Sequence, residues 1–520
     1  MNAPRRSIAI IGGGFAGICA GIYARMNGYQ AHIYEMHTVP GGLCTAWQRK
    51  GYTIDYCIHW LVGSAPASSL YQLWEEVGLA EGLQVVNLDE FYRLEGEDGR
   101  TVVFYRDLDR LRHHLRALSP IDAPVIDDFI GAAKRLEGKD LPSDLPPREI
   151  MSPWQGLRVM PKMLPFLMPM KKWRPVRLAE LAARFQDPLL QRTFSDIWTP
   201  TSSAFFLLVT LAWLHNGAAG YPVGGSLPLS RAIEKRFLDL RGEISYGARV
   251  SKILVEANRA VGIRLEDGRE VRADRVISAA DGHATLWELL DGRYTDARFR
   301  RYYESYEPFP GIVFVGIGVN RDCSDLPQTI TGWSLPLAEP WTYGTKTADR
   351  LTVRIHNFDP TLAPAGKTVI TAILEGDYEY WSTLRAADHE AYKAAKHELA
   401  QRVIARLDQR LPGIAGQVEM VDVATPATTE RYTGNWRGSM EGWLPTPGNM
   451  TEEMPKTLTG LSGFHMAGQW VAPGGGLPAG VMTGRGVIQL ICKEDGVTFR
   501  TPHRVEPGTG GQAAGGAAGM

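Results

Sequence analysis

Near the N-terminus, an apolar segment runs directly into a series of glycines. Ser7–Ile11 is a short apolar run bounded by glycine, which is typical of a buried parallel strand. Gly12, Gly14 and Gly17 follow with the spacing G-x-G-x-x-G, which occurs where a strand turns tightly into a helix. We therefore predict a strand, a tight turn and a helix over residues 15–27.

Each glycine of this loop has a separate physical role in binding a dinucleotide. Gly12 permits the tight turn, Gly14 lets a phosphate approach the backbone, and Gly17 lets the helix pack closely on the strand. The amides of the first helical turn, beginning at Phe15 and Ala16, would hold a pyrophosphate with help from the helix dipole. The alternative is a glycine-rich turn with a structural role only.

The residues that follow the helix favour FAD over NAD. A second strand, Gln30–Tyr34, ends at Glu35, whose carboxylate would accept a hydrogen bond from a ribose 2′-hydroxyl and would repel a 2′-phosphate. The doublet Gly41-Gly42 comes shortly afterwards. A compact NAD domain has no need of a second glycine doublet here, whereas a long flavin dinucleotide needs further close backbone approaches. We therefore predict FAD as the cofactor.

A second glycine-rich region stands at the other end of the chain. It consists of residues 467–470, with the sequence AGQW, and residues 473–478, with the sequence PGGGLP. Together with the N-terminal loop, it predicts that a cofactor is clamped by a domain whose two ends close over it.

With these motifs the chain resembles the FAD-dependent phytoene desaturase, carotenoid isomerase and retinol saturase-like family, which is related to the flavin amine oxidases. The resemblance covers roughly residues 7 to 495. The matching segments are the Gly12–Gly17 loop with Glu35, the Gly41-Gly42 doublet, and residues 221–225, 247–253, 273–280, 467–468, 473–480 and 484. The resemblance implies that FAD is bound by Gly12, Gly14, Phe15, Ala16, Gly17, Glu35, Gly41, Gly42, Leu43, Val250, Gly468, Gln469, Gly476, Leu477 and Pro478.

The chain departs from the family pattern at three positions. Leu43 stands where relatives often have arginine, and Cys57 stands where they often have glycine. Gln469 replaces an acidic residue that would meet the phosphate or ribitol region of the flavin; it can still donate and accept hydrogen bonds.

Composition narrows the remaining classes of function. The formal net charge of −1 offers no general case for nucleic acid binding. The five cysteines are scattered and lack CxxC pairs, which fits a reducing compartment without disulfides, and no spacing of metal ligands is present. Because the first strand begins within about seven residues, a signal peptide has no room, and we expect a cytoplasmic protein.

Two apolar segments bear on membranes. The run Ala204–Leu214 is about half the roughly 20 residues that a spanning helix requires, so we read it as a buried helix lining the substrate domain. Residues 154–174 interleave apolar and aromatic side chains with five cations and contain no acid. This pattern favours a membrane-facing lid over residues 152–176, on a protein that is peripheral to the bilayer. The alternative is a lid over the core whose prolines make irregular turns.

These motifs predict an α/β fold with two interleaved parts. A discontinuous, Rossmann-like FAD-binding domain would comprise residues 1–80, 220–300 and 450–495, and a substrate domain with a mixed sheet and a helical lid would comprise 81–219 and 301–449. Residues 501–520 would form a disordered tail. Within the substrate domain we predict strands at 311–319, 351–356 and 368–374 and a helix at 388–410.

Few side chains qualify for a polar role in the reaction. His59 follows the glycine doublet and is the candidate catalytic residue, although such a histidine more often orients backbone or fills a polar pocket. Trp470 would close over the flavin or the pocket, and Arg437 would line the substrate tunnel or lie in a solvated loop. His215 reads as a helix end and His465 as structural.

The resemblance implies an FAD-dependent oxidoreductase that desaturates or saturates a long apolar isoprenoid, polyene or lipid-like substrate by hydride transfer with the flavin. Three alternatives stay open: a redox-neutral isomerase using reduced FAD, a flavin amine oxidase with an aromatic cage, and a prenyl-lipid carrier without flavin, like the Rab GDP-dissociation inhibitors. The electron acceptor is unknown and could be oxygen, a quinone or another protein.

Overall fold

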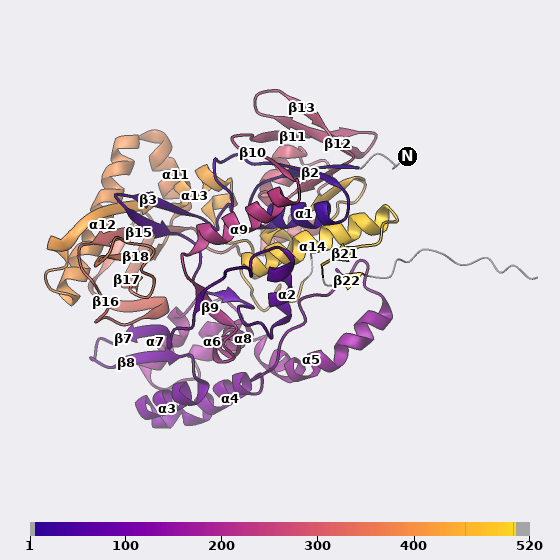
Figure 1. Cartoon of the computed structure of the whole chain (residues 1–520). Helices are drawn as coiled ribbons and strands as arrows, with labels where there is room; N and C mark the ends of the chain where they lie inside the picture. Colours follow the sequence, from indigo (N-terminus) through magenta and orange to yellow (C-terminus); the bar gives the residue numbers. More distant parts are fainter. Residues whose placement is uncertain (1–5, 453, 503, 506–520) are drawn as a thin grey trace, which may run out of the picture.

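A computed structural model describes residues 6–452, 454–502 and 504–505, and a five-stranded parallel sheet organises the part that holds both chain ends (Figure 1). The strands in spatial order are β10 (Glu243–Ser245), β2 (Gln30–Tyr34), β1 (Ser7–Ile11), β14 (Arg275–Ser278) and β20 (Phe464–Met466). The predicted strand, helix and strand are confirmed, with α1 spanning Phe15–Met26. Gly28 directly after α1 has φ +88°, a backbone conformation that glycine adopts without strain.

The two faces of this sheet are covered by different elements. Ile8, Ile10 and Ile33 face the helices α1, α9 (Ser226–Asp239) and α14 (Gly476–Glu494). Ala9 and Ile11 face the opposite way, toward an antiparallel ribbon and the short helices near it. The ribbon consists of β11 (Val250–Glu256), β12 (Arg259–Leu265) and β13 (Glu270–Arg272), and the helices are η2 (Ala284–Leu289) and α10 (Ala297–Ser305). Burial on both faces explains why β1 is apolar throughout.

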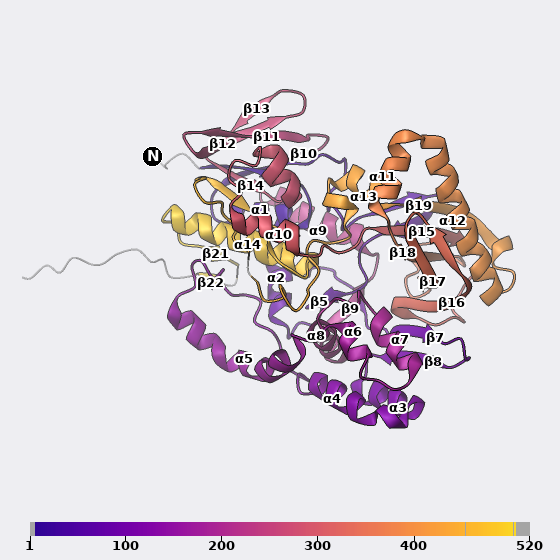
Figure 2. The same ribbon diagram turned by 180° about the vertical axis from the view of Figure 1, so that it is seen from behind.

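A second, seven-stranded mixed sheet forms the other large layer. Its order is β19 (Val418–Ala424), β15 (Ile312–Val319), β18 (Thr368–Glu375), β17 (Lys346–Ile355), β16 (Thr329–Tyr343), β7 (Glu90–Glu95) and β8 (Thr101–Tyr105). The helix α12 (His389–Arg410) packs on one face of it, and α11 (Tyr378–Ala387) and α13 (Pro426–Thr433) lie nearby (Figures 1 and 2). The predicted strands and the predicted long helix are confirmed here, although β17 begins earlier than expected.

Helices from the first half of the chain close the molecule below the two sheets in Figures 1 and 2. They are α2 (Ser69–Glu76), α3 (Leu108–Leu118), α4 (Ala123–Lys134), α5 (Pro153–Trp173), α6 (Leu178–Ala182), α7 (Pro188–Asp196) and α8 (Ala204–His215). α8 is buried, as predicted. Among the described residues, no helix has the length and apolarity needed to cross a bilayer.

The expectation of irregular, proline-broken structure in the lid segment is wrong. α5 is a continuous helix that contains Pro161, Pro165 and Pro169. Because these prolines recur every four residues, the missing N–H groups lie along one side of the helix. A capping box between Ser152 and Gln155 starts the helix and satisfies its first orphan donors.

The remaining elements are short. They are the pair β3 (Ala46–Arg49) and β4 (Tyr52–Asp55), the sheet β5 (Leu61–Val62), β9 (Ala219–Pro222) and β6 (Val85–Val86), and the turns η1 (Pro120–Asp122), η3 (Ala415–Gln417), η4 (Trp436–Gly438) and η5 (Gln469–Val471). At the start of the predicted tail, β21 (Arg500–Thr501) pairs with β22 (Arg504–Val505), so the expectation of disorder is wrong for these described residues. Residues 503 and 506–520 lie outside the described residues. The expected domain boundaries stay predictions.

Candidate functional site

The glycine loop between β1 and α1 is as tight as the spacing predicts. A Cβ atom on Gly17 would lie 2.0 Å from the carbonyl oxygen of Gly12, so α1 could not sit as close to β1 with any larger residue. Gly14 precedes the helix as its N-cap and offers no side chain to bond the first-turn amides. The amides of Phe15 and Ala16 therefore lack a capping side chain, which suits an anionic ligand at this helix end.

Glu35 lies directly beside this loop. Its carboxylate is buried and accepts hydrogen bonds from the backbone N–H of Gly13 at 2.6 Å and of His37 at 2.7 Å. Burial raises the pKa of Glu35 above its ordinary value, and the two N–H donors oppose that shift. Ala248, just before β11, donates to the Glu35 carbonyl at 2.8 Å, which places Val250 at the same end of the sheet.

The Gly41-Gly42 doublet packs against the same loop. Gly41 donates to the carbonyl oxygen of Gly13 at 2.9 Å, and a Cβ atom on Gly42 would lie 3.4 Å from the Cα atom of Gly14. Gly41 itself has φ +109°, so a side chain there would be strained. Leu43 is partly buried and packs against the hydrophobic cluster that contains Tyr52 and Ile54 of β4.

The C-terminal glycine region lies beside the N-terminal loop (Figure 1). A Cβ atom on Gly468 would lie 3.5 Å from the Ala16 Cβ atom, and one on Gly484 would lie 2.9 Å from the Ala16 carbonyl oxygen. Small residues thus let α14 and α1 pack backbone against backbone. The two ends of the chain come together as predicted, although Gln469 bonds Asn435 through its side chain, at 3.1 Å.

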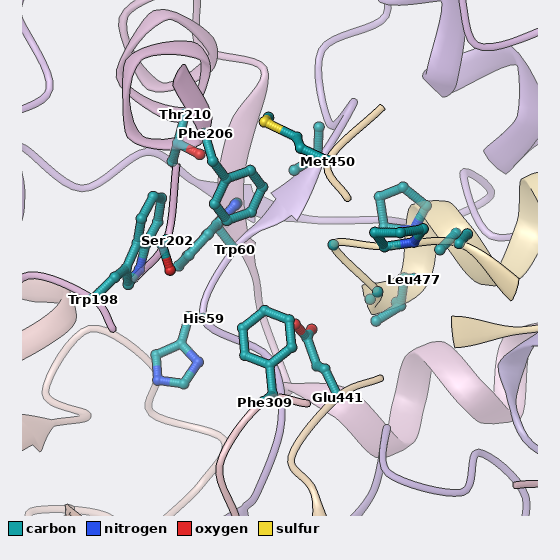
Figure 3. Close-up of a pocket in the computed structure, with 18 of the residues that line it drawn as sticks. His59, Trp60, Trp198, Ser202, Phe206, Thr210, Phe309, Glu441, Met450 and Leu477 are labelled. Carbon is teal, nitrogen blue, oxygen red and sulfur yellow. The ribbon is translucent and has the colours of Figure 1, made fainter. Parts of the chain in front are cut away.

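A large cavity begins where α14 begins. Its volume is about 1350 Å³, above the roughly 300–1,000 Å³ common for ligand pockets. Gly476, Leu477 and Pro478 line one end. Figure 3 shows the aromatic side chains that line it elsewhere, where the ring of Trp198 stacks 6.3 Å from that of Trp60. Further walls come from α5, α8 and the open face of the seven-stranded sheet.

His59 lines this cavity, as its position after the glycine doublet suggests (Figure 3). Its Nδ1 atom lies 3.0 Å from the carbonyl oxygen of Cys57. Because a carbonyl only accepts, Nδ1 carries the proton and Nε2 is an acceptor. Burial, assisted by the nearby Arg354 guanidinium, lowers the pKa of His59 to about 3, so the imidazole is neutral at physiological pH.

A buried polar network behind the cavity holds the His59 segment in place. Arg354 of β17 donates to the carbonyl oxygens of Ile58 at 2.8 Å and His59 at 3.2 Å. Ser226, at the start of α9, donates to the Asp55 carboxylate through its hydroxyl and to it again through its backbone N–H at 3.2 Å. The sequence places Arg354 within a predicted strand but contains no signal that its side chain reaches residues 58 and 59.

Glu441 is a cavity-lining acid that no sequence motif marks (Figure 3). It lies in the loop after η4, against the start of α14, where Cβ atoms on Gly475 and Gly476 would lie 3.1 and 3.3 Å from its side chain. Burial raises the pKa of Glu441 to about 8, so the carboxyl group holds a proton at neutral pH. A lone acid in a loop has no sequence signature, and only the fold brings it to the cavity.

This protonated carboxyl group predicts a pH-dependent stability. Between the ordinary pKa of 4.5 and the raised value of about 8, the folded chain holds a proton that the unfolded chain has released. The contribution of Glu441 to stability is therefore complete below pH 4.5 and is lost as pH rises toward 8.

Thermal unfolding of the wild type and Glu441→Gln between about pH 5 and pH 8 checks this expectation. The melting temperature of the wild type should fall relative to that of the variant as pH rises. Glu307→Gln is the matched control, because Glu307 also lines the cavity but is exposed and bonded by Thr201 at 2.8 Å. A constant difference between wild type and Glu441→Gln would contradict the assignment.

Two predicted substrate contacts, Trp470 and Arg437, are not among the side chains that line this cavity as the described residues form it, and their contact with a substrate stays a prediction. Trp470 is buried in an aromatic cluster, where its Nε1 donates to Asn435 at 2.9 Å and its ring packs edge-on 5.0 Å from Trp443. Arg437 is exposed, with its guanidinium 5.1 Å from the ring of Trp436. Trp470 lies within η5 and Arg437 within η4.

His215 and His465 occupy the structural positions that the sequence predicts for them. His215 ends α8 and accepts from the backbone N–H of Leu108 at 3.3 Å. His465 lies buried in β20 with its Nε2 atom 3.0 Å from Glu494. Cys57 is partly buried at the cavity wall and packs against the main hydrophobic cluster.

Comparison with known proteins agrees with this geometry. Residues 15–492 match the family described as flavin containing amine oxidoreductase. The chain belongs to this family. Prolycopene isomerase of Daucus carota is 25% identical over 95% of this chain and 81% of its own length. Phytoene desaturase (lycopene-forming) of Pseudescherichia vulneris is 23% identical over 94% of this chain and 99% of its own length.

Solved structures share the fold of this chain. An oxidoreductase from Methanosarcina mazei superposes with a TM-score of 0.58 at 17% identity, covering 93% of this chain and 99% of that one. Cyclohexylamine oxidase from Brevibacterium oxydans superposes with a TM-score of 0.57 at 13% identity, covering 94% of this chain and 99% of that one. The family membership identifies an FAD-dependent oxidoreductase with an α/β fold.

Proposed function

We propose that this flavin-dependent oxidoreductase acts on a long apolar isoprenoid, polyene or lipid-like substrate, which it desaturates or saturates. The observation that carries the proposal is the cavity of about 1350 Å³, which borders both the glycine-rich start of α14 and the lid helix α5. FAD, when bound, accepts or donates the hydride, while the protein positions the substrate and excludes water. Relatives named as phytoene desaturases and prolycopene isomerases support this substrate class.

The residues at the chain ends fit FAD. Close approaches that only glycine allows, at Gly17 and Gly41, leave the backbone open to a phosphate, and Glu35 stands at the end of β2 beside them. The proposed FAD contacts are Gly12, Gly14, Phe15, Ala16, Gly17, Glu35, Gly41, Gly42, Val250, Gly468, Gln469, Gly476, Leu477 and Pro478. Leu43 is a further proposed FAD contact, and its side chain also packs against the hydrophobic cluster that contains Tyr52 and Ile54.

Two side chains would handle protons at the reacting end. The neutral imidazole of His59 offers an acceptor at Nε2, and the protonated Glu441 offers a donor. In the view of Figure 3, both point toward the cavity from the same side, with Phe309 between them. A carotenoid-type C–H bond has low acidity, so we expect these groups to orient the substrate and shuttle a proton locally, with hydride transfer left to the flavin.

The alternative functions make different demands on the site. A redox-neutral isomerase is favoured by the relatives named prolycopene isomerase, and it would use the same cavity. An amine oxidase would need an enclosed aromatic cage without a lipid-delivery surface, whereas this cavity is bordered by Met163 and Met170 of α5. The intact glycine motifs argue against a flavin-free carrier.

An anaerobic absorption spectrum of the purified flavoprotein tests the proposal. Addition of a polyene lipid extract should bleach the oxidised flavin band if the enzyme desaturates, or reoxidise pre-reduced flavin if it saturates. A change of product without net change of the flavin would indicate the isomerase. Absence of any spectral or product change with polyenes, together with bleaching by a polar amine, would overturn the proposal.

We also propose that α5 rests on a bilayer surface and delivers the substrate. Its exposed apolar side chains recur at helical spacing and include Trp154 (75% exposed), Leu157 (62%), Leu164 (59%) and Met168 (73%). Cations flank this stripe, and α5 holds no acidic residue. Met163 and Met170 of the same helix line the cavity, so one element borders both the solvent and the site. Figures 1 and 2 both show α5 at the periphery of the molecule.

Vesicle flotation tests this membrane contact. Replacing Leu157, Leu164 and Met168 together by Gln should lower the fraction bound to anionic phospholipid vesicles at least about tenfold, because the inserted apolar area is lost. The control replaces Leu238 and Val421, exposed apolar residues on other elements, by Gln. Equal flotation of both variants, or no flotation of the wild type, would contradict the proposal.

A further inference from the structure

The strand β17 directs its side chains alternately to the core and to the cavity. Leu351 and Val353 pack into the core under α12. Arg350, Thr352 and Arg354 share the opposite face, because successive side chains of a strand point to opposite sides. Arg350 and Thr352 line the cavity, and Arg354 reaches the backbone of the His59 segment. β17 therefore joins the reacting end of the cavity to a second, polar end.

The guanidinium of Arg350 is held rigidly at that polar end. Its Nε donates to the Ser334 hydroxyl at 2.8 Å, and one Nη donates to the carbonyl oxygens of Ser334 at 3.1 Å and of Glu95. All these acceptors are neutral. Within the described part of the chain, no carboxylate lies within ion-pair distance of Arg350. Burial lowers the pKa of Arg350, and attraction to Tyr92, Asp196 and Asp349 offsets this loss of solvation only in part.

The acidic side chains that line this end are paired with other cations. Asp196 is bound by Arg192, which also bonds Asp349 at 2.6 Å, and Glu375 is bound by Lys346. Arg350 is thus a fixed, half-buried cation at the wall of a mainly apolar cavity, and its bonds to the protein are all to neutral groups. A charge so placed is stabilised by an anion that can enter the cavity.

We propose that Arg350 binds the carboxylate of an amphiphilic substrate whose long apolar chain fills the cavity toward His59. The inference rests on the proposed function and narrows its substrate class to long-chain, unsaturated carboxylic acids. Arg354 lies four residues further along β17, about 13 Å at the strand rise of roughly 3.3 Å per residue. The head group would therefore be anchored well away from the reacting carbons, and the reaction would occur within the chain.

Binding of parinaric acid, a fluorescent conjugated fatty acid, tests this assignment against binding of its methyl ester. The FAD-loaded wild type should bind the acid about tenfold or more tightly than the ester, since an arginine–carboxylate pair is a strong, charge-assisted bond. Arg350→Met should erase this preference while it leaves ester binding and flavin content unchanged. Thr352→Val is the matched control on the same strand face and should retain the preference.

Each outcome bears on the inference in a distinct way. Equal affinities of the wild type for acid and ester would overturn it and leave the proposed function standing. A preference for the acid that survives in Arg350→Met would also overturn it. Failure of the wild type to bind either probe would count against the apolar substrate class itself, and so against both proposals. The comparison of acid and ester in the wild type holds even if the variant fails to fold.

Discussion

Gly17→Ala is expected to reduce the FAD content of the purified protein to below about a tenth of the wild-type value, because the phosphate-binding turn requires this glycine. The new Cβ atom would lie 2.0 Å from the carbonyl oxygen of Gly12, which is backbone and cannot rotate away. α1 would have to move off β1, and the first-turn amides would move with it. Overpacking of this kind costs about 1–3 kcal/mol or more of stability.

The ratio of flavin absorbance to protein absorbance measures this effect. Gly131→Ala is the matched control, since Gly131 also lies in a helix but has nothing within 4 Å of its Cβ position. That variant should retain FAD and be at least as stable as the wild type, because alanine favours helix over glycine. Full flavin content in Gly17→Ala would show that the loop does not hold the cofactor as inferred.

Arg485→Met is expected to lower the free energy of unfolding by about 3–5 kcal/mol, because it leaves a buried carboxylate without its ion-pair partner. The Nε atom of Arg485 in α14 lies 3.2 Å from the Oε2 atom of Glu76 in α2. The two side chains are only 3% and 5% exposed. Tyr23 of α1 donates its hydroxyl to the same carboxylate at 2.6 Å. This cluster ties the C-terminal helix to two N-terminal helices, so its loss should loosen the clamp on FAD as well.

Urea unfolding of the FAD-loaded proteins measures the change. Adding Glu76→Gln to Arg485→Met should recover part of the lost stability, since the unpaired charge is then removed. Lys235→Met is the control, because Lys235 and Asp239 form an ion pair 2.6 Å long with both side chains exposed, and its loss should leave the free energy of unfolding nearly unchanged. Equal costs for Arg485→Met and the control would refute the role of the buried cluster.

The parts that were predictable from sequence are local. Gly12, Gly14 and Gly17 restrict the turn through their own backbone and packing, and Glu35 directly follows the short strand β2. The strands of the second sheet and the long helix α12 were also predictable, because the periodic spacing of apolar residues can be recognised within a short stretch of sequence.

Rules based on single residues fail where the conformation depends on several residues or elements at once. Prolines at 161, 165 and 169 predict broken structure one by one, yet their common spacing and a capping box allow a continuous helix. The packing of Trp470 edge-on to Trp443 was not predictable from sequence, because the direction of a side chain depends on what packs around it.

By itself, the sequence determined the cofactor class, the dinucleotide turn and the order of the main elements, because glycine spacing and apolar periodicity act over a few residues. Only the tertiary structure decided which side chains meet at the cavity. His59, Arg350 and Glu441 come from distant segments, and the tertiary fold brings them to the wall of one cavity. Their neutral or charged states also follow from that burial, which no stretch of sequence contains.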